Sequence, residues 1–352
     1  MAPPPPRSPT PTGAGLSSDA AASSSCPPSA ASCPPPLCST AACKASSSSP
    51  AAGQCNLANI RSRLRSLPFG RPALKNLFSL SPAALHVNHG GCGATPRFVV
   101  AKQKQLLEAM EAFPDRWFHS TVPRSVRASA ADLATFIGAD PQDVVFVVNA
   151  TTGINSVIRS LDLQQGDAVL CLDLTYRPVL NTLRFVCTVK QELVELVELP
   201  LPMPLPDADQ IVSMVERALA DNAPAVRLAV FDHITSPTAL VLPVARLVQV
   251  CRRYNVTVLI DGAHAPGQLP LNVREVGADF YVGTCHKWLF SPKGSAFLWA
   301  SPDAQDAVKP VVSDSRTHLF PPPKEKHART HTHTHHSLSL RVLVTFFPRC
   351  FL

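Results

Sequence analysis

Two hydrophobic periodicities alternate along the middle of the chain. Runs of consecutive apolar residues, typical of buried strands, are separated by segments with apolar positions three or four residues apart, typical of amphipathic helices. The expected strands are DVVFVV from Asp143, AVLCLDL from Ala168, LVELVEL from Leu193, VRLAVF, VTVLID, DFYVGT and SAFLWA from Ser295. The expected helices are RFVVAKQKQLLEAMEAF, INSVIRSL from Ile154, VLNTLRFVC, DADQIVSMVERALADN and PVARLVQVCRRYN. Asp207 is a suitable N-cap for the fourth helix, and Pro243 suits the first turn of the fifth.

Strands that are apolar throughout and alternate with helices predict an α/β fold. The central sheet should be mainly parallel, with helices on both faces. Sheets of this kind bind ligands beyond the carboxyl ends of their strands. We therefore expect the functional residues directly after each strand.

Both ends of the chain lack this pattern. Residues 1–57 consist mainly of Ala, Ser and Pro and cannot bury enough apolar surface to offset the entropy of ordering, so a disordered tail is expected. Their scarcity of acids fits an organelle transit peptide equally well, for example a chloroplast one; otherwise the expected location is the cytoplasm. We expect an N-terminal arm over residues 58–84, a large domain over 85–302 and a low-complexity or non-native tail over 303–352.

Composition narrows the classes of partner. The net charge is +7, but residues 1–66 and 321–352 hold ten basic and two acidic residues. The segment between them is close to neutral, so no nucleic-acid surface is expected. No apolar stretch approaches the ~20 residues of a membrane-spanning helix.

Cysteine and histidine give no strong metal signal. The eleven cysteines lack C-x2-C spacing, so free thiols in a reducing compartment are expected. The repeat HTHTHH near the carboxy terminus has the composition of a weak metal binder. It also resembles the translation of a simple nucleotide repeat, which we favour, and we predict no metal site.

Polar residues follow the first two expected strands. After DVVFVV, Thr151 and Thr152 lead into a helix, whose free N–H groups and positive dipole end suit a phosphate. The alternative is that a threonine simply caps the helix. After AVLCLDL comes Tyr176, which either stacks on a flat ligand or packs at the rim of the core.

Two further strands end in ionisable residues. Asp261 and His264 follow VTVLI; a carboxylate there can hold a proton on a heteroaromatic nitrogen or cap a helix. Thr284, His286 and Lys287 follow DFYVG. A lysine with a lowered pKa forms an imine with an aldehyde, whereas an ordinary lysine extends to the surface.

Taken together, these groups match one cofactor. A phosphate cradle, an aromatic plate, a carboxylate for a ring nitrogen and an amine for an aldehyde are the parts that hold pyridoxal 5′-phosphate. A dinucleotide-binding oxidoreductase is the competing class on such a sheet. The chain lacks G-x-G-x-x-G after a strand, which argues against that class.

Several separated segments also resemble a known family. NATTGIN, FDHITSPTALVLP, IDGAHAPGQLPL and GADFYVGTCHKWLFSPKG, in this order, resemble the class V aminotransferases, which are fold type I pyridoxal-phosphate enzymes. The similarity covers about residues 85–300 and is greatest to the isopenicillin N epimerase-like branch, with cysteine desulfurases as further relatives. HVNHGGCGATPR resembles the opening segment of that branch. The resemblance makes residues 85–302 the cofactor-binding large domain.

The resemblance implies a role for each candidate residue. Lys287 would be the Schiff-base lysine and Asp261 the partner of the pyridine nitrogen, with His264 beside the ring. The remaining implied cofactor contacts are Thr151, Thr152, Thr284 and His286 at the phosphate, Tyr176 over the ring and Ser236 near the phenolic oxygen. Lys293 is the competing lysine, but its SPKG setting is typical of a turn.

The resemblance ends before the family's smaller carboxy-terminal domain, which normally supplies an arginine for the substrate carboxylate. We therefore expect a largely missing small domain. The resemblance implies an amino-acid or amine substrate, a homodimer, and epimerase, transaminase or lyase chemistry. The alternative is a truncated, non-catalytic chain that retains only the cofactor-binding domain.

Overall fold

The computed structural model describes residues 70, 75–189, 194–202, 204, 207–222 and 225–309. The chain divides into residues 1–63 and 64–352, and every described residue belongs to the second unit. The tail, the transit-peptide hypothesis and the histidine repeat therefore lie outside the described residues, as does most of the predicted arm.

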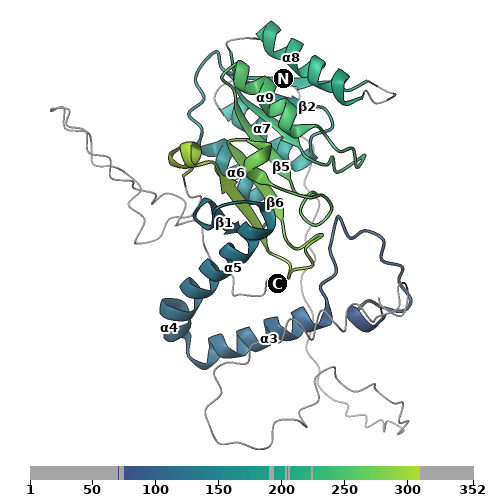
Figure 1. Ribbon diagram of the computed structural model, residues 1–352, viewed down its shortest axis with the longest axis vertical. Helices are drawn as coiled ribbons and strands as arrows, with labels where there is room; N and C mark the ends of the chain where they lie inside the picture. The colour runs from purple at the N-terminus through teal and green to yellow at the C-terminus, as the bar shows by residue number, and fades with distance from the viewer. Residues whose placement is uncertain are drawn as a thin grey trace, which may run out of the picture. The chain divides into compact units, whose positions relative to one another are not determined.

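Within the described residues, seven strands form one sheet in the order β1-β7-β6-β5-β4-β2-β3 (Figure 1). The strands are β1 (Val144–Val147), β2 (Ala168–Leu172), β3 (Glu195–Leu199), β4 (Val226–Asp232), β5 (Thr257–Gly262), β6 (Phe280–Thr284) and β7 (Ala296–Ala300). Strands β2 to β6 pair in parallel, and β7 is antiparallel to both β6 and β1. The predicted mainly parallel sheet is confirmed.

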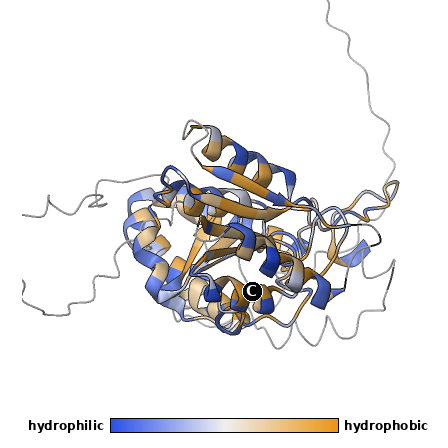
Figure 2. Cartoon of the chain, turned by 90° about the horizontal axis from the view of Figure 1, so that it is seen from above, coloured by the Kyte–Doolittle hydropathy of each residue, from blue (hydrophilic) through white to orange (hydrophobic). Residues whose placement is uncertain are grey.

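Helices lie on both faces of the sheet. The described helices are α3 (Arg97–Ala112), α4 (Pro114–Arg116), the π-helix η2 (Trp117–Thr121), α5 (Val122–Ile137), α6 (Ala150–Ser160), α7 (Arg177–Val189), α8 (Ala208–Asn222), α9 (Val244–Arg253), α10 (Val273–Val276) and the 3-10 turns η3 (Pro141–Asp143) and η4 (Pro302–Ala307). One apolar cluster joins α5, α8 and α9 to one face, and the other joins α6 and α7 to the opposite face. In Figure 2 the strands are mainly orange and lie between helices that also carry blue residues.

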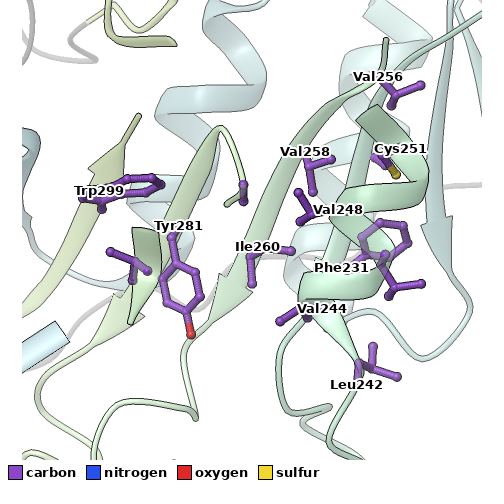
Figure 3. Packing of buried hydrophobic residues seen from close by; sticks show 14 of the residues in the cluster. Phe231, Leu242, Val244, Val248, Cys251, Val256, Val258, Ile260, Tyr281 and Trp299 are labelled. Atoms are coloured by element: carbon purple, nitrogen blue, oxygen red, sulfur yellow. The ribbon is translucent and has the colours of Figure 1, made fainter. Parts of the chain in front are cut away.

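Alternation along each strand decides which cluster a side chain joins. On β5, Val258 and Ile260 contribute to the α9 side, whereas Leu259 contributes to the α6 side. Figure 3 shows the α9 side, where Val248 of α9 and Phe231 of β4 lie near Val258 and Ile260. Since successive side chains of a strand point to opposite faces, Asp261 lies on the same side as α6.

The helix boundaries follow from local capping. The side chain of Asp207 accepts from the Gln210 N–H at 2.8 Å, and the Gln210 side chain accepts from the Asp207 N–H at 2.9 Å. This reciprocal capping box confirms the predicted N-cap. Asn149 caps α6 by accepting from the Thr152 N–H at 2.7 Å, so the interpretation of a threonine as that cap is wrong.

Two helices depart from the sequence-based expectation. The periodicity predicted α3, but none of its side chains is buried. In contrast, α5 was not predicted, although Val126, Ala130, Leu133 and Ile137 are buried along one side of it. Its alanines and serines give a weak hydrophobic signal, and the contact with the sheet decides the packing.

Candidate active site

The carboxyl ends of β4, β5 and β6 bring three polar residues to one edge of the sheet. Asp232 ends β4, Thr284 ends β6, and Asp261 is the last residue but one of β5; all three are buried. By strand alternation they lie on the face covered by α6 and α7. This edge is where a parallel sheet is expected to bind its ligand.

Lys287 lies in the turn that follows β6, beside His264. Its Nζ is 3.0 Å from the Nε2 atom of His264. The lysine is half-buried, and burial lowers its pKa, against the opposing influence of the Asp261 carboxylate. A half-buried amine next to an imidazole differs from a lysine that extends freely to the surface.

The two ring nitrogens of His264 have different neighbours. The indole N–H of Trp288 donates to Nδ1 of His264 at 3.4 Å. Burial, followed by the nearby Lys287 charge, lowers the His264 pKa to about 4, so the ring is neutral at physiological pH. Each ring nitrogen of His264 therefore has one partner, the Trp288 indole at Nδ1 and the Lys287 amine at Nε2.

Asp261 is a buried carboxyl that suits a positively charged partner. Only 4% of the residue is exposed, and its Oδ1 accepts from the Ala263 N–H at 3.0 Å. Burial raises the pKa of Asp261. Within the described part of the chain no ion pair contains Asp261. A protonated pyridine nitrogen would supply the missing charge, so this carboxyl fits a pyridoxal ring.

The amino end of α6 is the part of the site that could hold an anion. Thr151 and Thr152 are half-buried in the first turn of α6, and the helix begins at Ala150, earlier than the predicted start at Ile154. A Cβ on Gly153 would lie 3.1 Å from Val282, so α6 packs closely on β6. The amino end of α6 therefore lies beside β6, the strand that ends at Thr284.

His286 is close to this site but is held by another residue. Its Nδ1 lies 2.7 Å from the Ser295 carbonyl oxygen and 3.3 Å from the Ser295 backbone nitrogen. Burial lowers the His286 pKa, which favours the neutral ring. A phosphate at Nε2 would raise the pKa and favour the doubly protonated ring.

Tyr176 and Ser236 have different positions relative to the site. Tyr176 directly precedes α7 and is 39% exposed, and its backbone N–H lowers the pKa of the Asp232 carboxyl. Ser236 is exposed in the loop after β4. Among the hydrogen bonds of the described residues, none joins Ser236 to another predicted site residue. Its predicted position near the phenolic oxygen stays a prediction.

Sequence reasoning overlooked the contact between the HVNHGGCG segment and Lys287. His89 Nε2 donates to the Lys287 carbonyl at 2.9 Å, and its Nδ1 accepts from the Ala94 N–H at 3.3 Å. A Cβ on Gly93 would lie 2.1 Å from the His286 carbonyl oxygen. The density of glycines was the signal that backbone must approach closely here.

Asp232 was also overlooked, although the same rule that singled out Asp261 applies to it. Both are acids at the end of a buried strand, and they lie directly opposite each other in the β4–β5 register. The competing Lys293 is exposed, and its Nζ contacts Thr95 at 3.5 Å.

Two other features of the described residues bear on partners. The cysteines there, Cys92, Cys171, Cys187, Cys251 and Cys285, are free thiols. Within the same residues, no helix has the length and apolar character needed to span a membrane, and no cluster of three metal-ligating side chains occurs.

The sheet, with an amine, a carboxylate and a helix amino end at its edge, defines a fold type I pyridoxal-phosphate enzyme. The sequence profile of the Aminotransferase class-V family matches residues 89–335. The chain belongs to this family, whose cofactor is pyridoxal 5′-phosphate, and the resemblance seen in the sequence motifs is confirmed.

Curated relatives agree with this assignment. The chain is 38% identical over 243 residues to a rice protein (Oryza sativa subsp. japonica) named Putative L-cysteine desulfhydrase 1, covering 64% of this chain and 50% of the relative. It is 34% identical over 234 residues to the isopenicillin N epimerase of Amycolatopsis lactamdurans, covering 66% and 58% respectively. The chain thus spans about half the length of the curated relatives it matches.

Solved structures support the fold. A complex of the cystine C-S lyase C-DES with its product cysteine persulfide matches with a TM-score of 0.62 and 23% identity, covering 79% of this chain and 70% of the other. The cysteine desulfurase CsdA of Escherichia coli matches with a TM-score of 0.58 and 21% identity, covering 71% and 62%.

Proposed function

We propose that this chain is a pyridoxal 5′-phosphate-dependent enzyme that acts on an amino acid, with Lys287 as the residue that binds the cofactor aldehyde. The observation that carries the proposal is the Lys287–His264 contact of 3.0 Å. It lies at the edge of the sheet that also presents the buried Asp261 carboxyl.

The cofactor-binding roles follow from the chemistry of each group. The first turn of α6, with Thr151 and Thr152, would hold the phosphate together with Thr284 and His286. Asp261 would keep a proton on the pyridine nitrogen. His264 would lie beside the ring, Tyr176 would cover it, and Ser236 would lie near its phenolic oxygen. The support is position at one sheet edge and, for Asp261 and the amino end of α6, matching charge.

The residues around Lys287 suit it for moving a proton. The bound cofactor withdraws electrons from the substrate α-carbon and so makes its C–H bond more acidic. Lys287, once displaced by the substrate amine, would take up or return that proton at Nζ. His264 would keep the amine oriented through Nε2, while His89 would hold the Lys287 backbone carbonyl. The lowered pKa of Lys287 favours the free amine that such a base requires.

L-cysteine is the substrate class that the relatives favour. Two rice relatives are named L-cysteine desulfhydrases, and a fission-yeast relative is named hercynylcysteine sulfoxide lyase. We therefore propose β-elimination of sulfide from L-cysteine as the first reaction to test. Epimerisation and transamination remain the other reactions in the panel.

One observation favours a second candidate function. Since the chain spans about half the length of its relatives, the groups that recognise the substrate carboxylate have no assigned position among the described residues. A protein that binds the cofactor without turnover would have the same edge of the sheet. We propose a homodimer for either case.

We also propose a chloroplast location. A relative from Arabidopsis thaliana, 32% identical over 249 residues, is named Probable L-cysteine desulfhydrase, chloroplastic. The Ser/Ala-rich composition of residues 1–57 supports the proposal. Imaging of the full chain fused at its carboxy terminus to a fluorescent protein tests it, and a purely cytosolic signal would contradict it.

Turnover separates the two candidate functions. The full chain loaded with pyridoxal phosphate is assayed for sulfide release from L-cysteine and for consumption of other amino acids. We expect sulfide release that Lys287→Ala abolishes and Lys293→Ala retains. Cofactor binding without turnover of any amino acid would support the second candidate.

A further inference from the structure

We propose that Asp232 and Asp261 form a carboxyl pair that shares one proton, with Asp232 as its neutral member, and that this acid positions the turn bearing Tyr176. The inference rests on the proposed function, because it concerns the pocket for the pyridoxal ring. It assigns a role to Asp232, which none of the cofactor contacts above includes.

The geometry places the two acids side by side. Asp232 ends β4, Asp261 lies near the end of β5, and the two are direct partners in the parallel register. Neighbouring strands run about 4.8 Å apart, and strand alternation puts both side chains on the α6 and α7 face. The His233 N–H donates to the Asp261 carbonyl at 2.8 Å, which fixes the two strand ends relative to each other.

Burial makes two negative charges at this spacing very costly. Each residue is 4% exposed. In the described part of the chain, Asp232 takes part in no ion pair. Two adjacent buried carboxyls strongly disfavour ionising together, so the pair retains a proton.

The surroundings decide which member keeps that proton. Burial raises the pKa of Asp261, and the Ala263 N–H and the positive charge of Lys287 oppose that rise. Burial, followed by the Asp261 charge, raises the pKa of Asp232 to about 8. Asp261 therefore ionises first and Asp232 stays neutral at pH 7. The other titratable groups that interact with Asp232 are Lys287 after β6 and Cys171 of β2.

The same carboxyl meets the turn between β2 and α7. The backbone N–H of Tyr176 and the hydroxyl of Thr175 both lower the Asp232 pKa, the N–H more strongly. Thr175 is 5% exposed, and its hydroxyl has no hydrogen bond of standard geometry within the described residues. Asp232 thus lies next to this turn. It links the position of Tyr176 to Asp261, the proposed partner of the pyridine nitrogen.

A neutral acid also suits the ligand that the site is proposed to hold. A second negative charge beside Asp261 would add to the repulsion of a phosphate ester at the amino end of α6. A protonated Asp232 keeps a carbonyl oxygen for the Tyr176 N–H without that charge. Asparagine preserves this shape and this acceptor, whereas leucine removes the acceptor.

Infrared spectroscopy of the cofactor-free full chain tests the proton directly. We expect a carboxylic-acid C=O band at pH 7 that disappears with a midpoint near pH 8. Asp232→Asn should remove the band, and Asp261→Asn should move its midpoint to lower pH by removing the neighbouring charge. Asp143→Asn is the matched control, because Asp143 is a buried acid with a raised pKa at the opposite end of the sheet; it should leave the pH 8 transition in place.

The wild-type titration keeps the proposal open to refutation even if a variant fails to fold. Absence of an acid band that titrates near pH 8 would overturn the shared proton, as would a midpoint that Asp261→Asn leaves unchanged. Neither outcome concerns the cofactor, so a failure here is distinct from a failure of Lys287 to bind it.

Affinity for pyridoxal phosphate tests the positioning role. We expect Asp232→Asn to bind the cofactor within about threefold of wild type at pH 7, and Asp232→Leu to bind it at least tenfold more weakly, because leucine offers no acceptor to the Tyr176 N–H and the Thr175 hydroxyl. Equal affinities for the leucine variant and the wild type, in protein with unchanged circular dichroism, would overturn the role in positioning Tyr176.

Discussion

Replacing Tyr281 by phenylalanine removes one hydrogen bond beneath the proposed site and leaves the packing in place. The Tyr281 hydroxyl is 2.8 Å from Nδ1 of His233. Tyr281 is fully buried and His233 is 8% exposed. The tyrosine ring stacks on Phe297 with centroids 6.3 Å apart, and phenylalanine keeps that contact. A Cβ on Gly262 would lie 2.2 Å from the Tyr281 ring, so the ring has little room to move.

The structure sets the size of the effect. The variant loses the hydrogen bond and leaves His233 Nδ1 buried without a partner, which costs about 1–3 kcal/mol. Burial lowers the His233 pKa to about 4, and burial together with the Asp261 charge raises that of Tyr281. Neither group changes charge between pH 6 and 9 in the folded chain. The loss in the free energy of unfolding should therefore be constant across that range.

Guanidinium denaturation of the cofactor-free full chain measures this loss. Tyr254→Phe is the matched control, since Tyr254 caps α9 and is only partly buried; we expect less than about 0.5 kcal/mol there. A Tyr281→Phe loss no larger than that of the control would refute the reasoning. So would a loss that appears only below pH 5, because it would then depend on a charged histidine.

Three further predictions concern the site and its pH dependence. Gly93→Ala places a methyl group 2.1 Å from the His286 carbonyl and should weaken pyridoxal-phosphate affinity at least tenfold, as measured by fluorescence titration; unchanged affinity would contradict the close approach. Asp261→Asn removes a charge that raises the Lys287 pKa, so the pH midpoint for reductive labelling of Lys287 should move down, and an upward move would contradict the assignment. Between pH 6.5 and 4 the unfolded chain binds a proton at His233 that the folded chain does not, because burial lowers the folded pKa to about 4. Acid therefore lowers the free energy of unfolding in that window by up to about 3 kcal/mol. His233→Gln should reduce this loss, and denaturation curves at pH 4.5 and 7 show whether it does.

Periodicity was enough to predict the sheet because its strands are apolar on both faces. Apart from Thr257, every residue of β5 and β6 is buried, and parallel strands with two covered faces leave that signal in the sequence. The antiparallel direction of β7 was not predicted. The chain reaches β7 from β6 through Lys293 and Gly294. The direction in which β7 pairs depends on its contacts with β6 and β1, which no local pattern encodes.

The site could be predicted as a set of strand-end residues, but its contacts could not. Lys287, Asp261 and Thr284 were identified because each follows a buried strand. The approach of His89 to Lys287 joins positions 198 apart in the sequence, and no local pattern encodes it. Asp232 also follows a buried strand, as Asp261 does. Its proposed role depends on the strand register that places the two residues side by side, which the sequence does not show.

The central claim is that Lys287 binds pyridoxal phosphate. The full chain is incubated with pyridoxal phosphate, reduced with borohydride, digested and mapped by mass spectrometry. We predict a pyridoxyl label on Lys287, lost in Lys287→Ala and retained in Lys293→Ala. A label on Lys293 instead, or no label on well-folded protein, would contradict the account.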